Sequence, residues 1–345
     1  MAAPNILCDC TGMSEKRWLE CREHGPKGDI EYTVGGSDVA VIFGLSPWTT
    51  PLELWMVKKG RMKPKAPPNP KQLLMGHMLE PIAAHFYGLQ TGNTVIDDNH
   101  LYQHANLEYA LANIDRRYIR KEDGESGVLE CKSLTYHKAA DWADGAIPIY
   151  YELQLRYYLA VMDQRHGAFS ALWGNNPEHD LATPHIERDQ AREDIIFEKL
   201  DRWIWSLRHD KPPTMEDVKP NLAMAALARI YGASKKGLPT IEFPMKFEPK
   251  LRKIAALQKE NTELKGMIKK NEEAIEAHSV RIAELMKNHE HGILTTTTDK
   301  LLVDFATEVT KRVNSDYLKK EYPSVYTEAL RSSKSRKIKV TIQPV

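Results

Sequence analysis

The middle of the chain contains two runs of β-forming residues joined by a polar turn, and this pair restricts the fold more than any other feature. Residues 109–114 are small or apolar, and residues 127–132 resume a β-compatible pattern. Between them, residues 121–127 are dense in the glycine, serine and acidic residues that form turns. The sequence therefore predicts a β-hairpin over residues 113–132.

The charged residues of this hairpin form the first candidate site. Side chains alternate along a strand, so Glu130 and Lys132 are expected on one face while Cys131 points to the other. With Asp115 on the neighbouring strand, they could hold a divalent cation beside an amine, as metal-assisted phosphodiester hydrolysis requires. Taken alone, this pattern is more often a solvated hairpin with an ion pair, so the hypothesis depends on the flanking segments.

The composition is that of a soluble globular chain. Its 345 residues are 42% hydrophobic and 28% charged, enough for one large domain with elaborations or for two domains. Basic residues cluster at 58–71, 116–121 and 331–339, although the net charge is only +1. Such local patches can bind nucleic acid, but they are more often solvated faces.

The sequence argues against a membrane protein and against a disulfide scaffold. No apolar run approaches the length of a transmembrane helix, and the first residues lack the apolar segment of a signal peptide. Four cysteines in 345 residues indicate a reducing compartment. They include no Cys-x-x-Cys pair, so no iron–sulfur cluster is expected.

Helices predicted before the hairpin carry three further candidates. A serine-capped helix from Ser14 contains Arg22, and a Gly-Gly turn leads through Ser37 into a short apolar helix. Backbone N–H groups and a hydroxyl at such a turn favour a phosphate, although a plain N-cap is the commoner explanation. Residues 73–87 predict a mostly buried helix, in which Glu80 needs a partner such as a cation shared with the hairpin.

A long helix is predicted to begin after the hairpin at Pro148. Its residues Gln154 and Tyr158 are four apart and share one face. A buried strand is predicted over residues 168–173. Helix, hairpin, helix and strand in this order predict an α/β fold with a central mixed sheet flanked by helices.

The chemistry-bearing residues on these elements occur in the order Glu80, Asp115, Glu130, Cys131, Lys132, Gln154 and Tyr158. This order resembles the order of the motif residues in the PD-(D/E)XK nuclease superfamily. The resemblance implies a restriction-endonuclease-like core. With Trp18, Arg22 and the Gly-Gly-Ser-Asp run at 35–38, the resemblance narrows to the YqaJ-type viral recombinases, relatives of the phage lambda exonuclease. It covers about residues 14–175.

The resemblance implies a set of ligands for Mg²⁺, a hard ion suited to oxygen donors, for which Mn²⁺ is expected to substitute. Asp115 and Glu130, with the main-chain carbonyl of Cys131, would hold the catalytic ion. Glu80 would help to bind a second ion or its water shell.

The resemblance also implies roles for the remaining residues. Lys132 would position the attacking water and help to deprotonate it. Gln154 would orient this cluster, with Tyr158 packing behind it. Arg22 and Ser37 match the positions that grip the 5′ phosphate of one strand.

Members of this family digest double-stranded DNA from 5′ to 3′ as a ring-shaped homotrimer and leave a 3′ overhang, which a single-strand annealing protein uses. The resemblance thus implies a deoxyribonuclease in the cytoplasm of a bacterium or a phage-infected host cell. Two alternatives remain open. One is a structure-specific or single-strand endonuclease on the same core, and the other is an inactive DNA-binding or assembly protein.

The second half of the chain is expected to be an extension of the core, with residues 1–210 as the nuclease core and 211–345 as the extension. Apolar residues alternate by three and four across a predicted long helix, 246–288, as in a coiled coil. Because polar residues such as Asn261 interrupt this seam, a helix packed within the chain is favoured over self-association. A β-hairpin, a helix and a basic terminal strand over 336–342 are predicted to follow.

Overall fold

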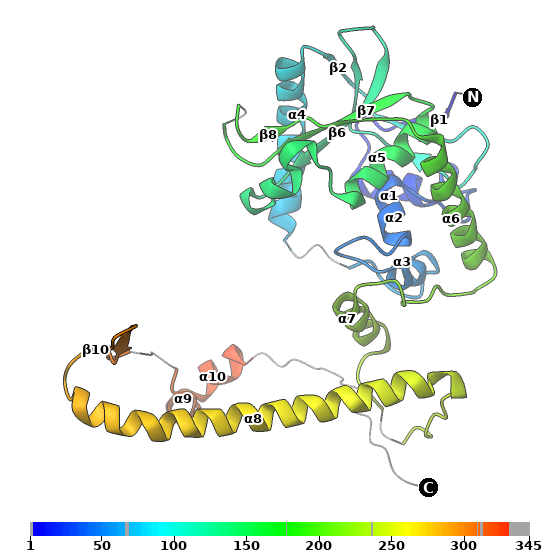
Figure 1. Cartoon of the computed structure of the whole chain (residues 1–345). Helices are drawn as coiled ribbons and strands as arrows, with labels where there is room; N and C mark the ends of the chain where they lie inside the picture. Colours follow the sequence, from blue (N-terminus) through cyan, green and yellow to red (C-terminus); the bar gives the residue numbers. More distant parts are fainter. Residues whose placement is uncertain are drawn as a thin grey trace. The chain divides into compact units, whose positions relative to one another are not determined.

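The computed structural model describes residues 3–65, 69–176, 178–235, 237–308, 310 and 313–330. The chain divides into two compact units, Met1–Gly232 and Ala233–Val345 (Figure 1). None of the helices in the described part of the chain is long and apolar enough to cross a membrane.

The first unit is built on a mixed sheet with the strand order β2-β5-β6-β7-β8, in which β9 also pairs with β7. The strands are β2 (Thr94–Asp97), β5 (Arg116–Ile119), β6 (Ser126–Ser133), β7 (His166–Leu172), β8 (Leu181–Ala182) and β9 (His185–Glu187). β5 and β6 are antiparallel, whereas β6 and β7 are parallel. The predicted fold class, a central mixed sheet flanked by helices, is confirmed.

Helices cover both faces of this sheet (Figure 1). On one face, Leu129 and Cys131 of β6 belong to a buried cluster with Ala83 of α4 (Pro70–Thr91). On the other face, Val128 of the same strand lies in the larger cluster formed with α5 (Ile149–Met162). Alternate side chains of β6 therefore face different helices, as the period of a strand requires.

The predicted hairpin is confirmed as β5 and β6, but the residues before it belong to a different sheet. A small sheet has the order β1-β3-β4, formed by β1 (Asn5–Asp9), β3 (His100–Gln103) and β4 (Leu111–Ala112). Between β4 and β5 the chain passes from one sheet to the other. Asn113 fixes this crossing, because its side chain donates to the carbonyl of His100 at 3.0 Å and accepts from the indole of Trp18 at 3.0 Å. Asp115 lies in this connection, immediately before β5.

Further helices complete the first unit: α1 (Glu15–His24), α2 (Gly36–Ile42), α3 (Pro51–Lys58), the 3₁₀ segment η1 (Tyr136–Gly145), α6 (Gln190–Arg208) and α7 (Pro220–Tyr231). The predicted caps are confirmed at α1, where Ser14 accepts from the backbone N–H of Arg17, and at α3, where Thr50 and Glu53 form a capping box. The unit extends past residue 210 because Arg229 of α7 forms an ion pair with Glu53 at 2.9 Å.

The prediction that residues 73–87 form a mostly buried helix is wrong in one respect. The helix exists as α4, but among its residues only Ala83, Ala84 and Tyr87 are buried. Its amino-terminal half exposes Leu74 and Met78 at 59% and 60%. The sheet ends under the carboxy-terminal half of α4, so the preceding apolar residues have no strand to pack on.

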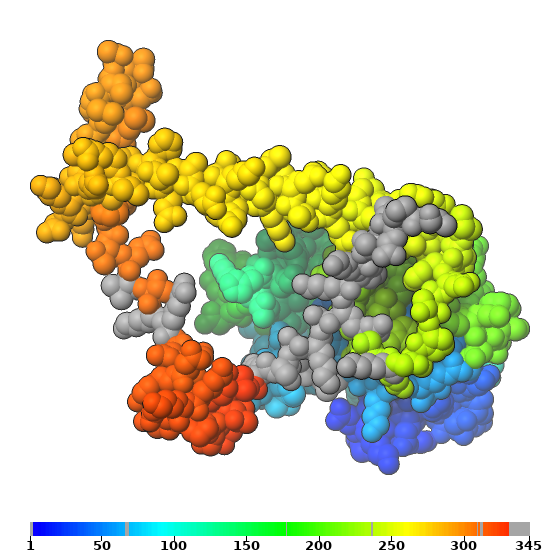
Figure 2. All heavy atoms as spheres, turned by 90° about the horizontal axis from the view of Figure 1, so that it is seen from below, coloured from blue at the N-terminus to red at the C-terminus, as the bar shows by residue number. Residues whose placement is uncertain are grey.

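The second unit contains the 3₁₀ segment η2 (Met245–Phe247), α8 (Glu248–Met286), the strands β10 (His291–Thr295) and β11 (Lys300–Asp304), α9 (Ser315–Glu321) and α10 (Pro323–Ala329). The predicted long helix and hairpin are therefore present. Figure 2 shows the side chains of α8, in yellow and orange, on the surface. The apolar residues of its predicted seam from Leu257 to Leu285 are exposed, at 45% for Leu257 and 73% for Leu285. The predicted basic strand over 336–342 lies outside the described residues.

Candidate active site

Glu130 is the centre of the site, and the strand that carries it is buried along most of its length. Its side chain is 2% exposed and faces α5. Its Oε1 accepts from Gln154 Nε2 at 2.5 Å and is also paired with the ammonium of Lys132. Its Oε2 is buried and has no hydrogen-bond partner. A buried carboxylate oxygen without a partner carries a desolvation penalty that a bound cation or donor would remove.

The electrostatic environment of Glu130 is dominated by its burial. Burial raises the pKa of this carboxyl, and the nearby charge of Asp115 raises it further, while Lys132 opposes both effects. Glu80 also acts on the pKa of Glu130 in the upward direction. The three carboxylates are thus close enough to interact, which is the condition under which a shared cation stabilises all of them.

Asp115 is hydrogen-bonded to the backbone of β6. Its Oδ2 accepts from the backbone N–H of Cys131 at 2.8 Å, which joins the connection before β5 to the middle of β6. The predicted neighbours Asp115, Glu130 and Cys131 are therefore brought together. Asp115, Cys131 and Lys132 also line one cavity of about 440 Å³ together with Glu80.

Glu80 reaches this cavity from α4 and has a partner that the sequence analysis did not identify. Arg116 Nη1 lies 2.7 Å from Glu80 Oε1, and its Nε lies 2.8 Å from Asp97. Burial and the charge of Asp115 raise the pKa of Glu80, whereas Arg116 lowers it. In the sequence, Arg116 is only one member of a basic cluster. Its position next to Asp115 is the one sign in the sequence that it could lie in the site.

Lys132 is held between a carboxylate and an aromatic ring. Its ammonium pairs with Glu130 and lies 5.2 Å from the ring centroid of Tyr151. Burial alone would lower the pKa of Lys132, but the charges of Glu130 and Asp115 raise it well above its usual value. The ammonium therefore donates to Glu130 in this arrangement, whereas the resemblance implies that Lys132 helps to deprotonate the attacking water, which requires the free amine.

Gln154 and Tyr158 lie on one face of α5, as predicted. Gln154 Nε2 is 3.3 Å from the hydroxyl of Tyr158, and Tyr158 is 4% exposed. Tyr158 packs so closely on α2 that a Cβ at Gly36 would lie 2.5 Å from its ring. Only glycine fits at this position, so the close approach of α2 and α5 depends on Gly36.

Arg22 and Ser37 are brought together from two helices. Arg22 Nη2 is 3.4 Å from the hydroxyl of Ser37, a long contact, and its guanidinium lies 4.6 Å from the ring centroid of Trp18. Both residues line a second cavity, of about 690 Å³, that also includes Glu80 and Asp115. The side chains proposed from the sequence thus line two neighbouring cavities that share Glu80 and Asp115, except for Glu130, which is buried behind them and contacts Lys132 and Gln154 of their linings.

The cysteines are distributed over two places. Cys8, Cys10 and Cys21 lie in one cluster under β1, whereas Cys131 is buried in the central sheet. Burial raises the pKa of the Cys8 thiol to about 12, and the neighbouring Cys10 adds to this.

The donor set fits a divalent cation although the acids are not arranged as a closed metal cluster. Among the described residues, no three His, Cys, Asp or Glu side chains converge closely enough to form one. Glu130 nevertheless has an oxygen without a partner, and Asp115 and Glu80 present oxygens to the same cavities. Carboxylate oxygens are the donors that Mg²⁺ prefers. Asp115, Glu130, Glu80 and the main-chain carbonyl of Cys131, which lines one of these cavities, are therefore the groups that would hold the ion.

Comparison with known proteins identifies a domain in the part of the chain that contains this site. Residues 17–165 match the YqaJ-like viral recombinase domain. The uncharacterized protein YqaJ of Bacillus subtilis (strain 168) is 26% identical over 335 residues, which cover 96% of each chain.

Two solved structures are similar to part of this chain. An alkaline exonuclease from Laribacter hongkongensis is 19% identical, with a TM-score of 0.46, over 57% of this chain and 94% of that one. A phage-related exonuclease from Haemophilus somnus 129PT is 15% identical, with a TM-score of 0.38, over 51% of this chain and 93% of that one. The match over residues 17–165 includes every candidate site residue from Arg22 to Tyr158, so the site lies within the part of the chain that is similar to the YqaJ-like viral recombinase domain.

Proposed function

We propose that the chain is a Mg²⁺-dependent exonuclease that digests double-stranded DNA from its 5′ ends and leaves 3′ single-stranded overhangs. One observation carries the proposal: Glu130 is buried with one oxygen unpartnered, beside Asp115 and a protonated Lys132. Two neighbouring carboxylates and an amine are the groups that metal-assisted hydrolysis of a phosphodiester uses. The similarity of residues 17–165 to the YqaJ-like viral recombinase domain supports the same activity.

Each residue has a definite part in the proposed reaction. A divalent cation, with Mn²⁺ able to replace Mg²⁺, would neutralise charge on the phosphate when it is bound. Lys132 donates from its ammonium to the attacking water or to a phosphate oxygen and stabilises the charge that develops there. Gln154 fixes the orientation of Glu130 through its hydrogen bond at 2.5 Å, and Tyr158 supports Gln154 from behind.

The polarity of the reaction would come from Arg22 and Ser37. A guanidinium and a hydroxyl are suited to a phosphate monoester, which carries more negative charge than the phosphodiester next to it. They line the same cavity as Asp115, so a 5′-terminal phosphate held there leaves the first internucleotide linkage near the acids.

Assembly and partners follow from the family rather than from the geometry. We expect a homo-oligomer, a trimer by resemblance, that acts in the cytoplasm with a single-strand annealing protein. The nuclease core, residues 1–210 in the sequence analysis, would supply the chemistry, and the extension from 211 to 345 would serve assembly or DNA contacts.

Linear duplex DNA labelled at either the 5′ or the 3′ end, incubated with and without Mg²⁺, tests the proposal. A 5′ label released at once as a mononucleotide, with a 3′ label kept on long fragments, is the expected result. Closed circular DNA should remain intact. Nicking of the circle would replace the proposal with an endonuclease, and tight duplex binding without cleavage in Mg²⁺ or Mn²⁺ would indicate an inactive DNA-binding protein.

A further inference from the structure

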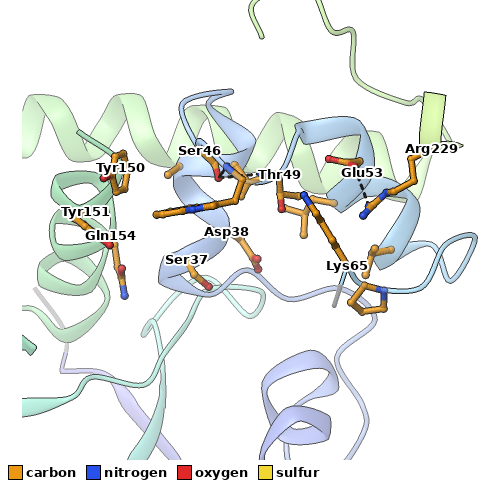
Figure 3. Close-up of a pocket in the computed structure, with 16 residues that line it drawn as sticks. Ser37, Asp38, Ser46, Thr49, Glu53, Lys65, Tyr150, Tyr151, Gln154 and Arg229 are labelled. Carbon is orange, nitrogen blue, oxygen red and sulfur yellow. Dashed lines mark hydrogen bonds and ion pairs between the residues drawn. The ribbon is translucent and has the colours of Figure 1, made fainter. Parts of the chain in front are cut away.

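A third cavity, of about 390 Å³, lies beside the candidate active site and has no part in the chemistry described so far. Figure 3 shows that Tyr150, Tyr151 and Gln154 come from one helix, α5, while Ser37 and Asp38 come from α2 on the opposite side. Trp48, from the connection between α2 and α3, also lines this cavity.

The aromatic side chains of this cavity form a continuous series that begins at Lys132. The ammonium of Lys132 lies over the ring of Tyr151, whose centroid is 4.5 Å from that of Tyr150. The edge of Tyr150 meets Trp48, with 5.1 Å between their centroids and 80° between their planes. The series thus leads from the buried amine to an indole that is 53% exposed.

Trp48 is 53% exposed, although Trp side chains are highly buried on average. Its ring stands at the rim of two cavities, the one described here and the one lined by Glu80 and Asp115. An indole with an open face beside a phosphate-processing site is the arrangement on which nucleobases stack.

Two acidic and two basic side chains line the cavity, the basic ones being Lys65 and Arg229. Its two acidic side chains are both paired: Asp38 with Lys58 at 3.3 Å and Glu53 with Arg229 at 2.9 Å. A neutral, flat ring would enter without breaking these pairs.

This cavity also shares residues with the site that would hold the phosphates. Ser37 and Gln154 line both this cavity and the one that contains Arg22 and Asp115. We consider a nucleotide with its 5′ phosphate at Ser37 and its 3′ linkage near Asp115. Its base could reach the aromatic series by passing between Ser37 and Gln154, the residues that the two cavities share.

We propose that this cavity binds the nucleobase of a 5′-phosphorylated nucleotide at the end of the digested strand, stacked on Trp48. The inference rests on the proposed exonuclease function, which it extends with a base-binding site. The stacking is tolerant of base identity, because every base presents a π-face. The same site would accept the base of a released deoxynucleoside monophosphate.

Binding of 5′-phosphorylated oligonucleotides with and without the first base tests the site. The full chain is titrated in Ca²⁺, to slow hydrolysis, with a single strand labelled at its 3′ end, and anisotropy is recorded. Removal of the first base should weaken binding by the native chain by about 5- to 150-fold, the range found for base–aromatic stacking. Deoxyadenosine monophosphate and deoxyribose 5-phosphate, used as competitors, show whether the released product binds in the same way.

Three variants assign the effect to Trp48. Trp48→Ala should bind both oligonucleotides equally, and Trp48→Phe should keep most of the preference for the base. Trp205→Ala is the matched control, because Trp205 is also 53% exposed but lies on α6 and does not line the cavity. It should behave as the native chain does.

Two results would overturn the base site. One is a native chain that binds the abasic strand as tightly as the intact strand, and the other is Trp48→Ala with an unchanged preference. In both cases Mg²⁺-dependent digestion of linear duplex would still support the proposed function. Base-dependent binding by a chain that digests no DNA would instead refute the exonuclease and leave the base site standing.

Discussion

Arg116 Nη1 lies 2.7 Å from Glu80 Oε1, so the residue that follows Asp115 in the chain holds the carboxylate that approaches from α4. Arg116 also donates to the carbonyl of Asp115 at 2.5 Å. This guanidinium supplies positive charge to a cluster of three acids that would otherwise repel one another. Such an arrangement would keep the acids together in the absence of a divalent ion.

The role of Arg116 predicts a stability defect that depends on Mg²⁺. Arg116→Ala should lower the free energy of unfolding by about 1.5–3 kcal/mol in EDTA, the cost of losing a hydrogen bond to a charged group. Saturating Mg²⁺ should return more stability to this variant than to the native chain, because the ion replaces the missing charge. Urea denaturation with EDTA and with Mg²⁺ measures both effects.

Arg120 provides the control for this prediction. It follows the same strand, β5, but its ion pairs with Asp123 and Glu187 are at the surface. Arg120→Ala should therefore change stability by less than about 1 kcal/mol, with no response to Mg²⁺. An Mg²⁺ response of equal size in both variants would contradict the role of Arg116.

The contact between Gly36 and Tyr158 predicts a second stability effect. Gly36→Ala would place a Cβ 2.5 Å from the buried ring and should cost about 1–3 kcal/mol through overpacking. Gly76→Ala, in α4, meets nothing within 4 Å and should instead stabilise by up to about 1 kcal/mol. Urea unfolding of both variants checks the signs, and stabilisation by Gly36→Ala would show that α2 and α5 are not packed as described.

The environment of the buried Asp98 carboxylate predicts how the stability of the folded chain falls at low pH. Burial would raise the pKa of Asp98, but hydrogen bonds from Tyr102, His100 and Arg117 lower it below its usual value. A lowered pKa in the folded state means that the unfolded chain binds protons first as the pH falls. The stabilisation is therefore complete above about pH 4 and is lost as the pH falls through the lowered pKa.

Asp98→Asn should remove this pH dependence. The variant should lose about 1.5–3 kcal/mol at neutral pH, the value of a hydrogen bond to a charged group, and should lose less further stability in acid than the native chain does. Unfolding free energies measured in urea across the acid range test this. Asp141→Asn, which affects an exposed ion pair with Lys138, should leave the native profile unchanged. An unaltered acid profile in Asp98→Asn would assign the acid limit to other groups.

Lys132 provides the most direct test of the chemistry. Lys132→Ala removes the protonated donor and should slow hydrolysis of linear duplex by about 10²- to 10³-fold, as loss of one charge-stabilising donor does elsewhere. DNA binding should remain largely intact. Lys138→Ala, an exposed lysine of η1, is the control. Cleavage by Lys132→Ala at the native rate would refute the proposed mechanism.

The site could be predicted from the sequence where regular strand and helix periods govern the side chains. The alternation along β6 separates Glu130 from Cys131, and the spacing of four along α5 places Gln154 beside Tyr158. The turn residues before β6 likewise predict its pairing with β5.

The features that the sequence did not reveal depend on contacts between distant segments. The pair formed by Arg116 and Glu80 joins β5 to α4, two elements far apart in the sequence. No local pattern of residues encodes this pair. Trp48 lies in an irregular connection, where no period indicates which way a side chain points. The exposed amino-terminal half of α4 was predicted to be buried because an apolar run cannot show where the sheet beneath it ends.

The position of Arg22 predicts a dependence on the chemistry of the DNA end. Arg22→Ala should slow digestion of 5′-phosphorylated duplex by about 10- to 100-fold, which corresponds to a lost hydrogen bond to a charged group. Digestion of 5′-hydroxyl ends, which lack the phosphate monoester, should slow much less. The measurement is the initial rate on two duplexes that differ only in this phosphate.

Arg17 is the matched control for Arg22, because it lies on the same helix, α1. Its guanidinium donates to the carbonyl of Pro26 at 2.6 Å and does not line the cavity that contains Asp115. Arg17→Ala should therefore keep the native preference for phosphorylated ends. If Arg22→Ala slows both kinds of end equally, Arg22 does not grip the 5′ phosphate.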